Sequence, residues 1–249
     1  MSWEPECYTR GNYFQNEINE WFRREFRIKP FGNILDVGCG DGQYTHTLAS
    51  QIKHGRVLGI DSSAAMIRYA NQHWATANLQ FEVHAIENFC PSLEYDFVLS
   101  FWCLHWTNIA LALTTIYRAL KPGGRLYAVF SALSDNSMLQ AWHELSKRPA
   151  YQTRQQKYQD PSNKQYLYQV INLLTRLPFR QVNIYSKITA THLPHLDYFL
   201  HLLKTMPFAQ TYSEQTLLDL CATFQTICQK KHGGNLYYET RPIFIEAIR

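Results

Sequence analysis

The segment Asn33-Ile-Leu-Asp-Val-Gly-Cys-Gly-Asp-Gly42 decides the fold of this chain. Residues 34–37 are mostly apolar, as in a parallel strand that is covered on both faces. Glycines follow at every second position, and without side chains they allow backbone angles and close approaches that other residues forbid. The pattern over residues 43–53 is helical. A strand, a glycine turn and a helix in this order predict a ligand lying against bare backbone beside the start of the helix.

Two acids define the kind of ligand. The G-x-G-x-G spacing lacks the third glycine that a dinucleotide site requires. Asp36 lies two residues before the first glycine, where it would repel a pyrophosphate but attract an ammonium group. A second apolar stretch, residues 56–60, ends on Asp61, in position to accept hydrogen bonds from two ribose hydroxyls. These features predict a nucleoside that carries a positive group and no phosphate, and S-adenosylmethionine fits.

Length and composition are those of one α/β domain. The chain has 249 residues, and its 24 Lys and Arg against 20 Asp and Glu leave a net charge of +4, too mild and scattered for a nucleic-acid groove. The N-terminal residues do not have the order of a signal peptide, and no run of about 18 apolar residues indicates a membrane span. Six cysteines occur without a C-x-x-C pair. We therefore expect reduced thiols, a cytoplasmic location, and neither a nucleic-acid nor a membrane partner.

Three segments resemble the signature segments of class I S-adenosylmethionine-dependent methyltransferases: Ile34-Leu-Asp-Val-Gly-Cys-Gly-Asp-Gly42, Gly59-Ile-Asp-Ser-Ser-Ala-Ala-Met-Ile67 and Leu120-Lys-Pro-Gly-Gly124. The resemblance implies a Rossmann-like, doubly wound α/β fold with a mainly parallel sheet, and S-adenosylhomocysteine as product. The cofactor-binding residues that it implies are Tyr8, Asp36, Gly38, Gly40, Asp61, Ser62, Met66, Ala85, Ile86, Ser100 and Phe101. Ala85 departs from the family, in which an Asp commonly contacts the adenine amino group here. Backbone groups at Ala85 and Ile86, or less readily Glu87, could replace that contact.

The stretch Ser100-Phe-Trp-Cys-Leu-His-Trp106 follows the predicted fourth strand, residues 95–100. It lacks the Asn/Asp-Pro-Pro-aromatic run of many amino-directed methyltransferases. Together with Tyr8, Asn12 and Gln15 it is similar to the small-molecule carboxyl methyltransferases of the juvenile hormone acid and trans-aconitate group. The opening Trp3-x-Pro-x-x-Tyr8 and the ending over residues 242–249 are similar to the trans-aconitate branch. The resemblance implies that Gln15 and Trp106 donate hydrogen bonds to the carboxylate of a small acid.

Other functions stay open at this point. His105 is either a neutral core residue or the base of a hydroxyl-directed methyltransferase. A malonyl group held by an acyl carrier protein is a less favoured acceptor, and a non-catalytic module that binds S-adenosylmethionine is a third interpretation. The Tyr117-x-x-x-Lys121 spacing of short-chain dehydrogenases is taken as coincidence because the glycine pattern is wrong for a dinucleotide, so a nicotinamide oxidoreductase stays only as a minor alternative. The histidines form no metal signature, and we expect no metal.

We expect one domain over residues 1–249. Residues 1–30 form an N-terminal lid with a helix over 12–26, residues 31–130 form the cofactor core, and residues 131–180 form a helical cap over the acceptor site. Residues 181–249 complete the sheet and add helices. The remaining patterns predict helices over 135–147, 163–176, 195–205 and 213–231, and strands over 181–188 and 236–248. Pro242 indicates an edge position or a bulge in the last strand.

Overall fold

The computed structural model describes residues 8–9, 11–26, 28, 31–131, 136–152, 162–206 and 211–249. Within them, seven strands form one sheet in the order β3-β2-β1-β4-β5-β9-β6. The strands are β1 (Ile34–Val37), β2 (Val57–Asp61), β3 (Leu79–Val83), β4 (Tyr95–Phe101), β5 (Leu120–Ser131), β6 (Gln181–Ser186) and β9 (Pro242–Ile248). β1 to β5 run parallel, whereas β9 runs antiparallel to its neighbours β5 and β6. The predicted mainly parallel sheet is confirmed.

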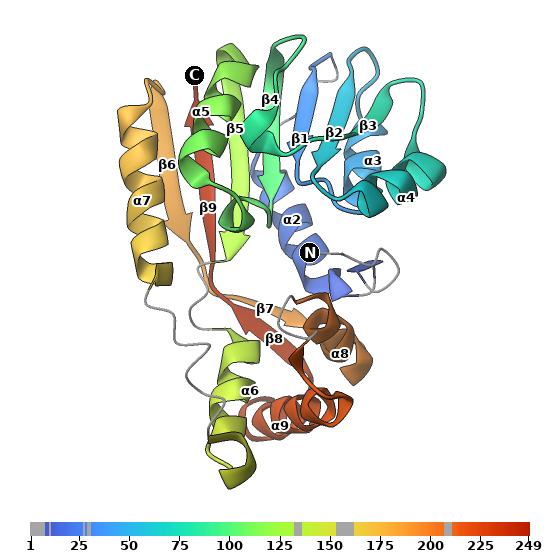
Figure 1. Ribbon diagram of the computed structural model, residues 1–249, viewed down its shortest axis with the longest axis vertical. Helices are drawn as coiled ribbons and strands as arrows, with labels where there is room; N and C mark the ends of the chain where they lie inside the picture. The colour runs from blue at the N-terminus through green and yellow to red at the C-terminus, as the bar shows by residue number, and fades with distance from the viewer. Residues whose placement is uncertain are drawn as a thin grey trace.

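Helices cover both faces of this sheet (Figure 1). One face packs against α2 (Tyr13–Glu25), α3 (Gln43–Ala49) and α4 (Ala64–Trp74), and the other against α5 (Ile109–Ala119) and α7 (Ser162–Arg176). Successive strand residues point to opposite faces, so Ile34 lies in the core beneath α2 while Leu35 lies in the core beneath α5. This alternation of apolar residues on both faces is what makes the sheet doubly wound.

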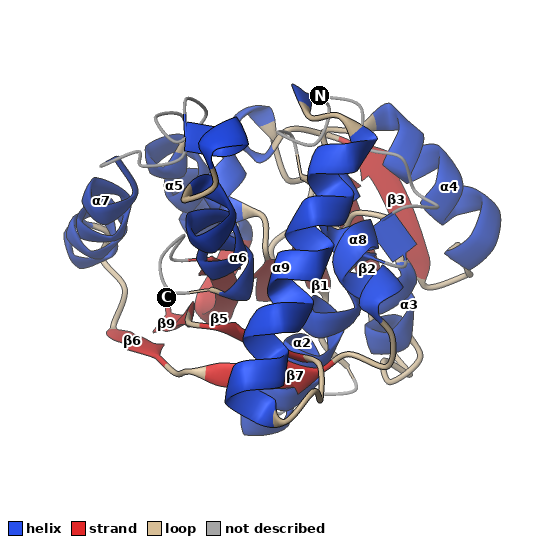
Figure 2. Cartoon of the chain, turned by 90° about the horizontal axis from the view of Figure 1, so that it is seen from below, coloured by secondary structure: helices blue, strands red, loops and turns tan. Residues whose placement is uncertain are grey.

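A further layer lies beyond the carboxyl ends of the parallel strands. It contains α6 (Ser137–Ser146), α8 (Leu196–Thr205), α9 (Glu214–His232) and a ribbon of β7 (Thr189–His192) paired with β8 (Tyr237–Thr240). α9 contacts both α6 and α8, and β7 contacts α2. Figure 2 views the molecule from this end, with α8 and α9 in front of the sheet. These elements form the helical cap.

The cap differs from the expected one. We expected it over residues 131–180, and α6 does belong to it. The expectation is wrong for α7, which packs on α5 and β6 because its apolar residues Val170 and Leu174 complete the core on that face. α8 and α9 supply the rest of the cap instead. Residues 132–135 and 153–161 of the expected cap lie outside the described residues.

The predicted last strand is divided at Arg241. Residues 237–240 pair with β7, and residues 242–248 enter the main sheet. The expected edge position or bulge at Pro242 is not found. Pro242 is instead the first residue of β9, opposite Ser131. Proline is tolerated at the start of a strand, where its missing N–H removes little of the ladder.

Candidate functional site

The glycine turn after β1 has the backbone that only glycine adopts readily. Gly38 and Gly40 have φ angles of 76° and 56°. A Cβ built on Gly38 would lie 2.4 Å from the Cβ and Sγ atoms of Cys103, and one on Gly40 would lie 3.1 Å from the ring of Tyr8. The turn is therefore packed between the chain that follows β4 and the N-terminal segment, with no room for a side chain at Gly38.

Asp61, at the end of β2, fixes this turn. One carboxylate oxygen accepts the backbone N–H of Gly40 at 3.1 Å, and the other accepts the N–H of Ser63 at 2.8 Å. Burial raises the pKa of Asp61, and these two hydrogen bonds act in the opposite direction. Because each carboxylate oxygen can accept a second hydrogen bond, Asp61 can hold the turn and still bind a ligand hydroxyl.

Asp36 is buried in β1 and accepts a hydrogen bond of 2.6 Å from the hydroxyl of Thr45. Burial raises the pKa of Asp36 to about 6, with a smaller contribution from the negative charge of Asp61, while the Thr45 hydrogen bond lowers it. At pH 7 the ionised form predominates. A buried carboxylate with one hydrogen bond favours a cationic ligand group.

A pocket of about 370 Å³, open to solvent, lies between α2 and the glycine turn. It is lined by Tyr8, Asn12, Gln15, Asn16, Asn19, Asp36, Gly38, Cys39, Asp41, Tyr44, Phe101 and Trp102. Four of these residues are amides at positions 12, 15, 16 and 19, which share one face of α2 and its N-cap because three or four residues make one helical turn. We call Asn12, Gln15, Asn16 and Asn19 the amide stripe.

Three members of the amide stripe take part in hydrogen bonds. Asn16 donates from Nδ2 to Oδ1 of Asn12 at 3.2 Å, and Asn19 accepts the indole N–H of Trp102 at 2.9 Å. Gln15 makes no side-chain hydrogen bond with any residue in the described ranges, so its amide can turn toward a bound molecule. The pocket thus offers amide donors on one wall and two carboxylates, Asp36 and Asp41, on the other.

The N-terminal segment covers the glycine turn. Thr9 donates its hydroxyl to Asp41 at 2.9 Å, and the ring of Tyr8 lies against Gly40. Burial raises the pKa of the Tyr8 phenol, and the nearby Asp41 and Asp61 raise it further. Tyr8 therefore stays protonated, as a hydrogen-bond donor in an acidic surrounding. Trp3 and Pro5, which belong to the motif that contains Tyr8, lie outside the described residues.

The structure brings only some of the predicted residues to this pocket. Tyr8, Gln15, Asp36, Gly38 and Phe101 line it. The other predicted cofactor residues do not line it: Gly40, Asp61, Ser62, Met66, Ala85, Ile86 and Ser100. Among them the N–H of Met66 is bonded to the N-cap Ser63, and Ser100 donates to the carbonyl of Val37, joining β4 to β1.

Ala85 and Ile86, which are expected to contact the adenine, follow a residue that is bonded to Asp61. His84, the residue before Ala85, donates its backbone N–H to the carbonyl of Asp61 at 3.0 Å. Ile86 is buried in the core on the α5 face, and Met66 is also buried. Glu87 accepts the backbone N–H of Asn108 at 2.8 Å and so ties this turn to the start of α5.

His105 and Trp106 do not line the pocket. They lie in a 3-10 turn, Leu104–Trp106, whose Leu104 is buried in the core on the α5 face. Burial lowers the pKa of His105 to about 3, and its Nδ1 has no partner among the described residues. Trp106 is 46% exposed. Because Leu104 packs on the α5 face of the sheet, this turn does not face the amide stripe, which is on α2.

Sequence reasoning named Asn12 but missed six other lining residues. The spacing of Asn12, Asn16 and Asn19 with Gln15 could have indicated the amide stripe, because it puts four amides on one helix face. Trp102, Tyr44, Cys39 and Asp41 carry no comparable pattern.

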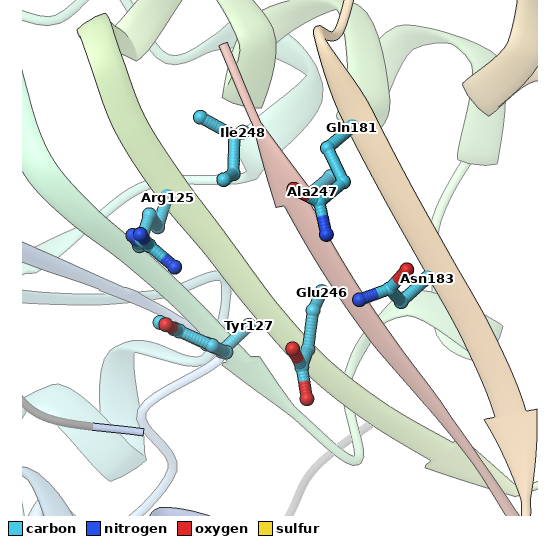
Figure 3. Close-up of a pocket in the computed structure, with 7 residues that line it drawn as sticks. All are labelled: Arg125, Tyr127, Gln181, Asn183, Glu246, Ala247 and Ile248. Carbon is cyan, nitrogen blue, oxygen red and sulfur yellow. The ribbon is translucent and has the colours of Figure 1, made fainter. Parts of the chain in front are cut away.

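A second pocket, of about 210 Å³, lies on the face of β5, β9 and β6 (Figure 3). Its residues come from three adjacent strands: Arg125, Tyr127, Gln181, Asn183, Glu246, Ala247 and Ile248. Arg125 pairs with Ile248, whereas the carboxyl end of β5, at Ser131, pairs with Pro242. The second pocket is therefore at the other end of the sheet from the glycine turn.

Two kinds of feature are absent from the described ranges. No group of three or more His, Cys, Asp or Glu side chains lies close enough together to bind a metal ion there. None of the helices in those ranges combines the length and apolarity that a bilayer span requires.

Comparisons with known proteins agree with this geometry. Residues 34–124 match the family model described as a methyltransferase domain. The chain is 30% identical over 138 residues to a trans-aconitate 2-methyltransferase of Deinococcus radiodurans, covering 55% of this chain and 52% of that protein. It is 28% identical over 160 residues to the juvenile hormone acid O-methyltransferase of Bombyx mori, covering 56% and 58%. The chain thus spans about half the length of the curated relatives it matches.

The fold comparison covers nearly all of the chain. The structure of a phosphoethanolamine N-methyltransferase of Haemonchus contortus superposes with a TM-score of 0.57 at 18% identity, over 98% of this chain and 59% of that one. At this identity the likeness concerns the fold alone. Residues 34–124 of this chain therefore contain a methyltransferase domain, and the doubly wound sheet that includes them has the class I methyltransferase fold.

Proposed function

We propose that this protein transfers the methyl group of S-adenosylmethionine to the carboxylate of a small organic acid, giving a methyl ester and S-adenosylhomocysteine. The observation that carries the proposal is the pocket between the glycine turn and the amide stripe. It combines a cofactor cradle with neutral hydrogen-bond donors, and such donors suit an anionic acceptor without competing as nucleophiles.

The residues fit the cofactor. Gly38 presents backbone without a side chain to the pocket, Asp36 is a buried acid for the ammonium group, and Asp61 has acceptor capacity left for ribose hydroxyls. When bound, the cofactor supplies an activated methyl group. The protein then has to align the acceptor and exclude water. Tyr8 and Thr9, which cover the turn, are suited to the second task.

Gln15 is the residue that we propose holds the acceptor carboxylate. Its amide lines the pocket and is not bonded to any described side chain. A carboxylate is ionised near pH 7 and needs no base, which suits a pocket lined by amides. The name of the Bombyx mori relative, an acid O-methyltransferase, is consistent with this acceptor class. Trp106 stays a weaker proposal as a second donor, because it does not line the pocket.

A hydroxyl acceptor is less well supported. It would need a base, and the proposed base was His105. A histidine whose pKa is about 3 binds a proton too weakly for that role near pH 7. His105 is also absent from the pocket lining.

The test is transfer of a labelled methyl group to a panel of acids, with ester formation followed by mass spectrometry. The panel contains free monocarboxylic and polycarboxylic acids, malonyl groups on acyl carrier protein, and alcohols. Base-labile methyl esters of free acids are the expected product. Gln15→Leu should raise the KM for the acid at least about tenfold, with little change in cofactor affinity. Methylation of alcohols alone would contradict the proposal, and reaction of carrier-linked acids alone would assign the acceptor to the carrier protein.

A further inference from the structure

The phenolic hydroxyl of Tyr44 is buried and has no hydrogen-bond partner among the described residues. Tyr44 lies in the first turn of α3, and its ring packs edge-on against Phe101 with centroids 5.5 Å apart. Both residues line the pocket. A buried hydroxyl without a partner destabilises the folded protein, so its presence at a pocket wall points to a partner that comes from a bound molecule.

The groups around Tyr44 are already occupied. Thr45, the next residue, donates to Asp36 at 2.6 Å. Glu20 and Arg23 are close enough to influence the Tyr44 pKa, which burial raises, but Arg23 bonds to Glu20 at 2.9 Å and to Gln51 at 3.2 Å. Tyr44 is therefore a neutral donor that no side chain in the described ranges uses.

The pocket lining supplies two kinds of group. Asp36 and Asp41 supply negative charge beside the glycine turn, whereas Tyr44 and Asn16 supply neutral donors. Asn16 uses one amide hydrogen for Asn12 and keeps the other. A ligand that satisfies both kinds has an ammonium and a carboxylate group close together. The methionine part of S-adenosylmethionine is such a zwitterion.

We propose that Tyr44 donates its phenolic hydrogen to the α-carboxylate of the cofactor, while Asp36 pairs with the α-ammonium. This assignment rests on the proposed function, because it takes S-adenosylmethionine as the ligand of this pocket. The assignment gives Tyr44, which lies outside the glycine motif, a role in cofactor binding. Gln15 stays available to bind the acceptor carboxylate.

Calorimetric titration with two ligands tests the assignment. S-adenosylhomocysteine carries both charged groups, and its decarboxylated analogue keeps the ammonium but lacks the carboxylate. The unmodified protein should prefer S-adenosylhomocysteine by about ten- to a hundredfold, as expected for a hydrogen bond to a charged group. Tyr44→Phe should lose most of this preference by weakening S-adenosylhomocysteine alone. Ligand-free Tyr44→Phe should melt at the same or a higher temperature, since it removes an unpartnered hydroxyl.

Tyr185→Phe is the matched control. It removes a phenolic hydroxyl that donates to Glu246 near the second pocket, and it should leave the affinities for both ligands unchanged. Equal weakening of both ligands by Tyr44→Phe, or no weakening, would overturn the assignment while leaving the proposed function intact. If the unmodified protein bound neither ligand, the cofactor and this assignment would fail together.

Discussion

The indole N–H of Trp102 donates a 2.9 Å hydrogen bond to the amide oxygen of Asn19, joining the carboxyl end of β4 to the amide stripe on α2. Both residues are buried. Trp102 has a φ angle of 60°, which is unfavourable for a residue with a side chain, and its backbone N–H donates to Val129 at 2.6 Å. A strained residue held from two sides at a pocket wall indicates that the wall is fixed before a ligand binds.

The Trp102 and Asn19 pair should behave as a coupled unit. Trp102→Phe leaves the Asn19 oxygen buried without a donor, and Asn19→Leu leaves the indole N–H without an acceptor. Each should lower the free energy of unfolding by about 1–3 kcal/mol. The double variant should lose less unfolding free energy than the two single variants together, by about 1 kcal/mol or more, because it leaves neither group unpaired. Urea denaturation of the four proteins measures this coupling, and additive effects would show that the pair is not a unit.

Gly38→Ala tests the packing of the glycine turn. Its Cβ would meet Cys103 at 2.4 Å, in addition to the unfavourable φ of 76°. Gly123 is a matched control, because its φ is 79° and its Cβ would have nothing within 4 Å. Gly123→Ala should therefore lower the free energy of unfolding by about 1–2 kcal/mol, through the backbone effect alone. Gly38→Ala should lower it by clearly more. Equal losses in urea denaturation would mean that Cys103 does not limit the space at Gly38.

Cofactor binding should depend on pH through Asp36. Burial raises the pKa of Asp36 to about 6, so its carboxyl is mostly neutral below that pH. An ammonium group binds the ionised form, so binding lowers this pKa and releases a proton. The affinity for S-adenosylhomocysteine should therefore rise from pH 5 to pH 7, by about tenfold per unit below the pKa.

Calorimetry between pH 5 and 7.5 measures this dependence, and buffers of different ionisation enthalpy count the protons. Asp36→Asn should bind more weakly and lose the slope. An unchanged slope in Asp36→Asn would assign the titration to another group, with Asp41 the first to examine, because burial also raises its pKa.

The sequence predicted those parts of the site that depend on neighbouring residues. The glycine turn and the position of Asp61 at the end of β2 follow from short segments with strong backbone requirements. The same holds for most helix and strand bounds, because apolar periodicity fixes them locally.

Contacts between distant segments could not be predicted in this way. Asn19 and Trp102 are 83 residues apart, and neither residue type indicates the partner. α7 and α9 are both amphipathic helices, and only the core left open beside α5 and β6 decides which one joins the sheet. The exposure of Trp106 likewise follows from the burial of Leu104 in the core on the α5 face of the sheet.

The most direct test of the central claim is calorimetric titration with S-adenosylhomocysteine of the unmodified protein, of Asp61→Ala and of the exposed-site control Asp197→Ala. Asp61 holds the Gly40 and Ser63 amides, and we propose that it also holds the ribose. The unmodified protein and Asp197→Ala should bind one equivalent with the same affinity, and Asp61→Ala should bind about a hundredfold more weakly or not at all. No saturable binding by the unmodified protein, or unchanged binding by Asp61→Ala, would contradict a cofactor site at the glycine turn.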